Sequence, residues 1–346
     1  MFAFLLTPRF YLILFVGQMC AACTVSSSTF TTLLQQHGAS LPAFQNFPNY
    51  FLMNLVYGGY TIYKYGWKKW ARMIWTDGWK YLIFSFFDVQ GNYFVVLAYQ
   101  YTTLLSGQLI SFWAIVLVVI ISFFVLKVRY HWSQIVGILI CCGGMGVLIY
   151  NDNMGGSGHG VNELKGDMFM LVSASCYGLS NVLEEFLVSK KPLYEVIGQI
   201  GFWGMIINGT QTAIFDRKAF STINWDGKTG GYIIGYSLSL FIFYTLVPIL
   251  LRMASAAFLN ISLLTANFWI VVIGTRLFNF KLGRLYPAAF VMIMVGLLIY
   301  YLLSSFLGEA TKPWLGEDQQ KGVSGIGTAK RKLAKHGVAG TGVESV

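Results

Sequence analysis

Charge is scarce in this chain. Only 11% of its 346 residues are charged, whereas 56% are hydrophobic and the mean hydropathy is +0.61. Soluble globular proteins carry about 25% charged residues, so the composition excludes an ordinary soluble domain. Apolar runs of about 18 or more residues recur along most of the length, which is the pattern of transmembrane helices. The sequence therefore predicts a polytopic membrane protein.

Residues that usually build enzyme sites are also few. The four histidines are dispersed in loops and the tail, and neither H-E-x-x-H nor G-x-S-x-G occurs. The five cysteines lie inside apolar runs, so we expect no disulfide. The pair Cys20-x-x-Cys23 has no histidine or second pair beside it, and buried thiols are ordinary packing residues. We therefore expect no catalytic residue, no metal site and no cofactor.

The net charge of +10 does not indicate a nucleic-acid partner. The basic residues lie in the connectors between apolar runs and in the tail, and they form no interleaved aromatic patch. Loop lysine and arginine set the orientation of membrane proteins. Their bias places both termini in the cytosol, with the connector 276–284 as an exception.

We predict ten membrane-spanning segments, each helical because lipid offers an open backbone no hydrogen-bond partner. The segments are 10–33, 46–65, 80–100, 104–126, 132–150, 166–189, 194–215, 229–251, 254–278 and 284–307. They form a first half, 1–150, and a second half, 166–307. A glycine-rich connector, 151–165, joins the halves, and a basic, disordered cytosolic tail follows at 308–346.

An internal echo relates the two halves. Leu104–Trp113, LLSGQLISFW, returns as Asn260–Trp269, NISLLTANFW, and Gly146–Tyr150 returns as Gly296–Tyr300. Five helices per half is an odd number, so equivalent helices would run antiparallel. Many secondary transporters use such inverted repeats to alternate access around a midplane site. The predicted fold is an all-α integral membrane protein with ten transmembrane helices in two inverted five-helix repeats.

Charged and amide side chains inside the apolar runs are candidate site residues. A charge at the bilayer centre costs about 2.5–3.5 kcal/mol on the insertion scale, so such groups are usually functional. Asp88 and Asn92 are four apart and share a helix face. For Asp88, a structural ion pair with Arg72 or Lys80 is the alternative.

A second group of candidates lies in the predicted span 166–189. Asn181 shares a face with Tyr177, and Glu184 lies beside that face near the cytosolic end. The alternative for Glu184 is that it reaches the membrane interface and pairs with Lys190 or Lys191.

The two copies of the echo supply the remaining candidates. Polar residues on shared helix faces are Gln108, Ser111, Asn260 and Asn267. Their alternative role is interhelical hydrogen bonding, worth about 0.6 kcal/mol on average. Trp113 and Trp269, which end the two copies, either stack a planar substrate or fill the bundle.

Three stretches, Asp88–Trp113, Gly166–Phe186 and Arg252–Trp269, carry a family resemblance in order and spacing. From about residue 10 to 307 the chain resembles subfamily F of solute carrier family 35, in the drug/metabolite transporter superfamily. The resemblance implies ten helices in two inverted halves around a central cavity, and movement of a solute without ATP hydrolysis. Superfamily relatives carry nucleotide sugars, sugar phosphates, amines and vitamins, and nucleobase- or nucleoside-like micronutrients are suggested for this subfamily.

The chain departs from that family pattern at three positions. Gln90, Ser111 and Asn267 stand where animal members carry acidic residues. The resemblance therefore does not bring a cationic substrate, or proton coupling through these positions, to this chain. Asp88, Asn92, Asn181, Glu184 and Glu185 do match the pattern.

We therefore predict a multi-pass secondary transporter that moves a small polar organic solute by alternating access. The solute would be a nucleotide sugar, a nucleobase- or nucleoside-like compound or a related metabolite, and Asp88 or Glu184 would pair with it or titrate. A non-transporting membrane scaffold or receptor with the same fold is the alternative. The expected partners are the lipid bilayer, the solute and, as an open alternative, a second copy of the chain in a homodimer. The membrane would be an endomembrane (Golgi, ER or vacuole) or the plasma membrane.

Overall fold

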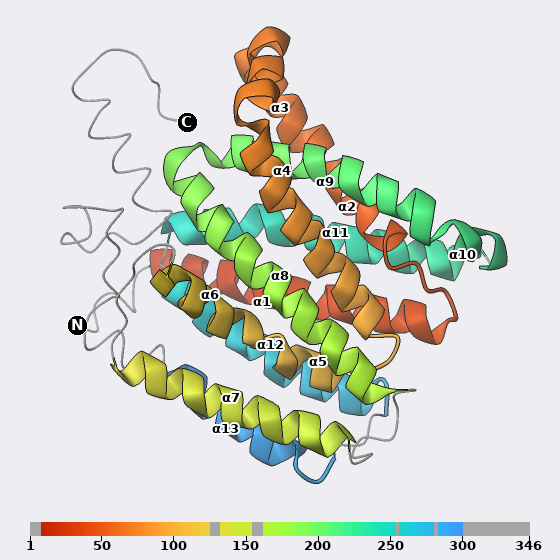
Figure 1. Ribbon diagram of the computed structural model, residues 1–346, viewed down its shortest axis with the longest axis vertical. Helices are drawn as coiled ribbons and strands as arrows, with labels where there is room; N and C mark the ends of the chain where they lie inside the picture. Colours follow the sequence, from red (N-terminus) through yellow and green to blue (C-terminus); the bar gives the residue numbers. More distant parts are fainter. Residues whose placement is uncertain are drawn as a thin grey trace.

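Helices make up the regular structure of the computed structural model (Figure 1), which describes residues 8–124, 132–153, 162–223, 225–253, 256–279 and 283–299. The elements are α1 (Pro8–Gln36), η2 (Phe44–Asn46), α2 (Phe47–Met53), η3 (Asn54–Gly58), α3 (Gly59–Tyr65), α4 (Trp67–Ala98), α5 (Leu104–Ile110), α6 (Trp113–Phe124), α7 (Trp132–Asn153), α8 (Glu163–Lys190), α9 (Leu193–Phe215), α10 (Arg217–Thr222), α11 (Gly227–Met253), α12 (Ala256–Arg276) and α13 (Tyr286–Leu298).

Most predicted spans coincide with one helix, but the span 80–100 begins much earlier. It is the second part of α4, which starts at Trp67 and is 32 residues long. The sequence predicted a connector at 66–79, where lysines and an arginine gather. Charged residues do not end a helix, however, and the turn before α4 is made by Gly66 at φ +80, a conformation that favours glycine.

Two other predicted spans are interrupted. The span 46–65 consists of α2, the π-helical segment η3 and α3. The span 104–126 is divided into α5 and α6 at Ser111 and Phe112. Local bonds of the tighter i+3 type mark this break, from the Phe112 N–H to the Leu109 carbonyl at 3.3 Å and from the Ala114 N–H to the Ser111 carbonyl at 3.1 Å.

Two of the described helical segments, Trp67–Ala98 and Gly227–Val247, are long and apolar enough to cross a membrane, with hydropathies of 1.3 and 1.5. Only 17% of the apolar window in Gly227–Val247 is buried, so most of that surface faces outward. Large apolar side chains are exposed on other helices as well, among them Phe15, Leu55 and Leu139. Outward apolar side chains suit contact with lipid tails.

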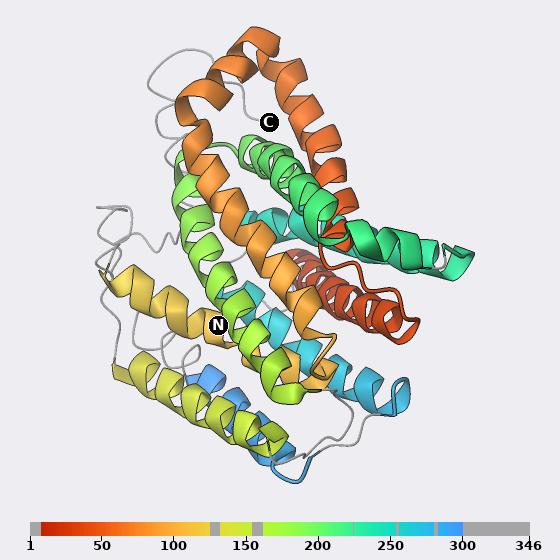
Figure 2. The same cartoon turned by 45° about the vertical axis from the view of Figure 1, so that its right-hand side comes forward.

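Helices from the first half pack mainly against helices from the second half. α1 lies against α11 and α12, and α8 lies against α4 and α6. α2 and η3 pack on α9, α5 packs on α12, and α7 packs on α13. Figures 1 and 2 show α7 and α13 as an adjacent pair along one side of the molecule. The contacts of α1 and of α8 are thus reciprocal between the halves.

The described residues form two main apolar clusters. The larger one joins α5, α7, α12 and α13 through residues such as Leu109, Leu148 and Ile293. The second joins α2, α4 and α9 and includes Tyr50 and Phe84, both at most 1% exposed. Tyr50 is also a member of the candidate site described below, so this second cluster packs directly around that site.

Asp216 anchors the segment before α2. Its Oδ2 accepts hydrogen bonds from the backbone N–H groups of Ala43, at 2.9 Å, and Phe44, at 2.7 Å. The side chain follows α9 in sequence, so these bonds tie η2 to the end of α9. Burial raises the pKa of the Asp216 carboxyl above 3.8, while the two N–H groups lower it by a smaller amount.

The raised pKa of Asp216 predicts a pH-dependent contribution to stability. The folded protein holds the proton more tightly than the unfolded chain, so this contribution is fully present below pH 3.8 and is lost as the pH rises through the folded-state pKa. We expect Asp216→Asn, which retains one acceptor oxygen, to remove this dependence. Asp216→Ala should lower the free energy of unfolding by about 1–3 kcal/mol because two N–H groups lose their acceptor. Thermal melts between pH 4 and 7 test both, and an unchanged pH profile in Asp216→Asn would contradict the assignment.

Candidate functional site

A buried carboxylate on α4 is the centre of the candidate site. Asp88 is 4% exposed, and its oxygens accept hydrogen bonds from three hydroxyl groups. The Tyr50 hydroxyl lies 2.7 Å from Oδ2, the Tyr244 hydroxyl lies 2.9 and 3.0 Å from the two oxygens, and the Ser180 hydroxyl lies 3.5 Å from Oδ1. Burying a charge is costly unless polar groups replace water, and these hydroxyls do so.

Asn92 lies one turn further along α4 and extends the same network. Its amide nitrogen donates to the Tyr50 hydroxyl at 2.8 Å and to the Asp88 backbone carbonyl at 3.0 Å. Its amide oxygen accepts a hydrogen bond from the Tyr177 hydroxyl at 2.8 Å. We call the set Asp88, Asn92, Tyr50, Tyr177, Ser180 and Tyr244 the Asp88 cluster; its members come from α2, α4, α8 and α11.

The close packing of α4 on α8 brings the cluster together. Gly91 has no side chain, and a Cβ there would lie 2.9 Å from the Tyr177 ring. The Ser173 hydroxyl also donates to the Gly91 carbonyl at 2.7 Å. The ring of Tyr177 therefore fits against the α4 backbone with its hydroxyl directed to Asn92.

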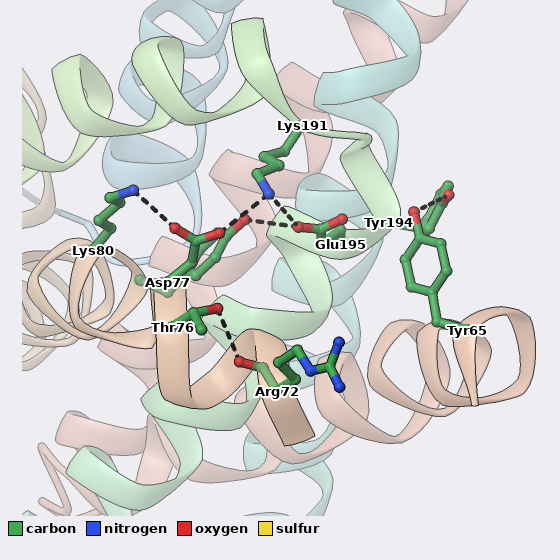
Figure 3. Close-up of polar contacts among 9 residues, drawn as sticks. Tyr65, Arg72, Thr76, Asp77, Lys80, Lys191, Tyr194 and Glu195 are labelled. Carbon is green, nitrogen blue, oxygen red and sulfur yellow. Dashed lines mark hydrogen bonds and ion pairs between the residues drawn. The ribbon is translucent and has the colours of Figure 1, made fainter. Parts of the chain in front are cut away.

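Two of the lysines that the sequence offered as partners for the candidate carboxylates, Lys80 and Lys191, pair elsewhere (Figure 3), and the side chain of Lys190 lies outside the described residues. Lys80 lies 2.8 Å from Asp77, and Lys191 lies 3.3 Å from Asp77 and 3.6 Å from Glu195. In the part of the chain that the structure describes, Asp88 forms no ion pair, so its partners there are neutral groups. A carboxylate held by hydroxyls can change partners without separating two opposite charges.

Glu184 and Asn181 lie further along α8 than the cluster. Glu184 is half-buried one turn beyond Ser180, and Asn181 is exposed. The hydrogen bonds of the described residues do not connect either side chain to Asp88. Of the candidates on α4 and α8, the structure thus joins Asp88 and Asn92 directly.

The first copy of the echo packs on α8 as well. The Trp113 indole N–H donates to the Ser175 hydroxyl at 3.2 Å. The Ser111 hydroxyl donates to the Gly107 carbonyl at 2.8 Å and lies 3.6 Å from the Met170 sulfur. Gln108 is half-buried on α5. The face of α8 that carries Ser175 therefore meets the echo, while the Tyr177 hydroxyl bonds to Asn92 and the Ser180 hydroxyl to Asp88.

The second copy lies in α12, which packs against α5 and runs antiparallel to it in Figures 1 and 2. Leu105 fits against Gly274, where a Cβ would lie 2.9 Å from the leucine side chain. Asn267 is 1% exposed, whereas Trp269 is 56% exposed. The side chain of Asn260 lies outside the described residues. The echoed segments are neighbours, but Trp269 is not enclosed with the Asp88 cluster.

Four members of the Asp88 cluster were not predicted as site residues: Tyr50, Tyr177, Ser180 and Tyr244. The only signal for them was a hydroxyl group inside an apolar run. With 20 tyrosines in the chain, that signal selects no particular pair. The hydroxyls are recognised once α2, α8 and α11 are seen to surround Asp88.

A cavity of about 320 Å³ lies elsewhere, between η2, α2, α9 and α10. Phe44, Phe47, Thr212 and Arg217 are among its lining residues, and it shares none with the Asp88 cluster.

Within the described ranges, no three histidine, cysteine, aspartate or glutamate side chains come together in a group that could hold a metal.

A known protein family and several known proteins match most of the chain. The model of the family described as solute carrier family 35 (SLC35F) matches residues 6–302. A solute carrier family 35 member of Schizosaccharomyces pombe is 49% identical over 329 residues, which are 95% of this chain and 65% of that protein. Solute carrier family 35 member F2 of Mus musculus is 33% identical over 288 residues, 82% of this chain and 77% of the mouse protein.

A solved crystal structure has the same overall fold. It aligns with a TM-score of 0.56 and 16% identity, over 86% of this chain and 98% of the matched chain. At that identity the likeness concerns the fold alone. The chain spans 65% of the length of its fission yeast relative, so the activity of the whole protein is a matter for proposal.

Proposed function

Because this chain belongs to solute carrier family 35, a family of multi-pass membrane transporters, we propose that it moves a small polar organic solute by alternating access. The family resemblance seen in the sequence is confirmed by this match. We propose a nucleotide sugar or a nucleobase- or nucleoside-like metabolite as the solute. The homodimer, the cytosolic termini and the choice of endomembrane or plasma membrane also remain proposals.

The observation that carries the proposal is the Asp88 cluster. It is a buried polar network to which helices of both sequence halves contribute, α2 and α4 from the first and α8 and α11 from the second. Asp88 precedes the end of α4 at Ala98 by ten residues. At 1.5 Å per residue this is about 15 Å, or half of the roughly 30 Å hydrocarbon thickness. If Ala98 marks the membrane boundary, Asp88 lies near the midplane, where secondary transporters bind substrate.

The chemistry of the cluster suits a solute rich in hydrogen-bonding groups. A ribose hydroxyl or a base N–H could replace the hydroxyl of Tyr50 or Tyr244 as a donor to the Asp88 carboxylate. The released tyrosine hydroxyl could in turn bond to the solute. Ser111 and Asn267, which are neutral where relatives carry acids, favour hydrogen bonding over binding of a cation.

Alternating access requires two arrangements of the helix bundle around this site. The reciprocal contacts of α1 with α11 and α12, and of α8 with α4 and α6, support two inverted repeats that rock against one another. We propose ten membrane helices in these repeats, with α2, η3 and α3 together as one of them and α5 with α6 as another.

The proposal is tested first by finding a ligand and then by measuring flux. A thermal-shift screen of nucleotides, nucleotide sugars, nucleobases and amines should identify a stabilising compound, because a ligand at 100 times its Kd contributes about 2.7 kcal/mol. Uptake of that compound into proteoliposomes should fall about tenfold or more in Ser111→Leu and Asn267→Leu, which remove polar groups proposed to line the cavity.

The matched control is Thr210→Leu, an exposed position on α9 whose hydroxyl, among the described residues, bonds to the Ile206 carbonyl of its own helix. It should leave uptake and expression unchanged. Full uptake in both Ser111→Leu and Asn267→Leu would contradict the proposed lining. A stabilising ligand that is bound by wild type but never accumulated would favour the receptor or scaffold.

A further inference from the structure

The hairpin formed by α3 and the first turns of α4 reaches beyond the rest of the described helices. Figures 1 and 2 show it projecting at one end of the molecule. At 1.5 Å per residue the 32 residues of α4 are about 48 Å long, whereas the hydrocarbon core is about 30 Å thick. Part of α4 therefore extends out of the hydrocarbon, and the basic residues of its first turns identify that end.

One outward face of α4 changes in character along its length. Lys68, Arg72, Trp75 and Trp79 are spaced i, i+4, i+7 and i+11, so they share this face. Both cations are exposed, Trp75 is 90% exposed and Trp79 is 60% exposed. One further repeat along the same face, Phe86 is 46% exposed. Along this face the cations come first, then the tryptophans and then an apolar side chain. This order matches the headgroups, the interface and the acyl chains of a lipid leaflet.

The two cations on this face are not engaged within the described part of the chain. Lys80 pairs with Asp77, and Lys69 lies 4.3 Å from the centre of a tyrosine ring. Lys68 and Arg72 form no side-chain hydrogen bond or ion pair with a described residue. Figure 3 shows the guanidinium of Arg72 apart from the carboxylate of Asp77.

From this geometry we infer that Lys68 and Arg72 bind the headgroups of anionic phospholipids, with Trp75 and Trp79 at the level of the membrane interface. The planar guanidinium of Arg72 suits two phosphate oxygens, and the ammonium of Lys68 supplies a second point charge one turn away. A juxtamembrane basic cluster attracts the anionic lipids of a leaflet. This lipid site shares no residue with the Asp88 cluster. The inference therefore does not depend on which solute the protein carries.

Quenching of tryptophan fluorescence by brominated lipid tests the inference on the full chain in proteoliposomes. The quencher is either brominated phosphatidylserine or brominated phosphatidylcholine at the same mole fraction. The chain has 10 tryptophans, of which two are in the proposed site, so the excess quenching by the anionic lipid should approach about a fifth of the fluorescence. Raising the salt from about 0.1 M to about 1 M should reduce this excess, because the Debye length shortens from about 10 to about 3 Å.

Three variants locate the effect. Lys68→Gln with Arg72→Gln should abolish the excess quenching and leave quenching by phosphatidylcholine unchanged. Trp75→Phe with Trp79→Phe should also abolish the excess. The control Lys218→Gln with Lys228→Gln removes two exposed cations from α10 and α11 and should keep it. Equal quenching by the two lipids in wild type, or an excess that survives Lys68→Gln with Arg72→Gln, would overturn the inference.

Discussion

Replacing Asp88 by leucine is expected to abolish transport and to lower the free energy of unfolding by about 2–4 kcal/mol. The leucine cannot accept the hydrogen bonds that Tyr50 and Tyr244 donate at 2.7 and 2.9 Å. Both hydroxyls lie in a buried network, so they would lose an acceptor without gaining water. Uptake into proteoliposomes and thermal melting in detergent measure the two effects.

The variant Asp88→Asn separates the charge from the shape of the side chain. An amide keeps one acceptor oxygen, and the tyrosine hydroxyls can rotate to accept from its nitrogen, so we expect stability within about 1.5 kcal/mol of wild type. Transport should still fall about tenfold or more, because a donor stands where the solute needs an acceptor. Transport at the wild-type rate in Asp88→Asn would contradict a role for the carboxylate.

The matched control for Asp88 is Asp77→Asn on the same helix. Asp77 is partly exposed and pairs with Lys80 and Lys191 near the end of the bundle. Exposed ion pairs contribute about 0–1 kcal/mol, so stability should change little and transport not at all. Equal losses in Asp77→Asn and Asp88→Leu would show that any carboxylate on α4 is equivalent.

Replacing Gly201 by valine is expected to cost about 3 kcal/mol or more and to remove most of the folded protein. A Cβ at Gly201 would lie 2.5 Å from the backbone nitrogen of Asn54 and 2.8 Å from the backbone carbon of Met53. These are backbone atoms, so relief requires that α2 and η3 move away from α9. Such a movement would also withdraw the Tyr50 hydroxyl on α2 from Asp88. Size-exclusion chromatography and thermal melting report the outcome.

Gly59→Ala provides the control for this substitution. Gly59 is also helical, but no atom lies within 4 Å of the position that a Cβ would occupy. Alanine there should raise stability by about 0.5–1 kcal/mol through the lower flexibility of the unfolded chain. If Gly201→Val melts at the same temperature as Gly59→Ala, the close approach of α2 and α9 is not as described.

The sequence predicted the helical membrane architecture and the approximate position of most helices, because these follow from hydropathy and length. It also related Leu104–Trp113 to Asn260–Trp269, which lie in segments that prove to be neighbours. The sequence did not predict the first turns of α4, because lysines and an arginine interrupt the apolar run there without ending the helix. The break at Ser111 was missed because nothing in its apolar surroundings differs from a continuous helix.

The candidate site was only partly predictable. Asp88 and Asn92 were visible as polar groups inside an apolar run, and the structure joins them by hydrogen bonds. Tyr50 and Tyr244 could not be chosen from the sequence, because the direction of a hydroxyl depends on how helices far apart in the chain pack together. Trp269, which was expected either to stack a planar substrate or to fill the bundle, has a side chain that is 56% exposed, and its role stays a prediction.

Exchange is the most direct test of alternating access around Asp88. Labelled solute, identified by thermal shift, is offered to proteoliposomes that are either empty or preloaded with the unlabelled compound. Wild type should take up label several-fold faster into the preloaded vesicles, because return of the loaded carrier resets the site. Asp88→Asn should lose that stimulation and Asp77→Asn should retain it. Equal uptake by wild type into empty and preloaded vesicles would contradict the account and would indicate a channel.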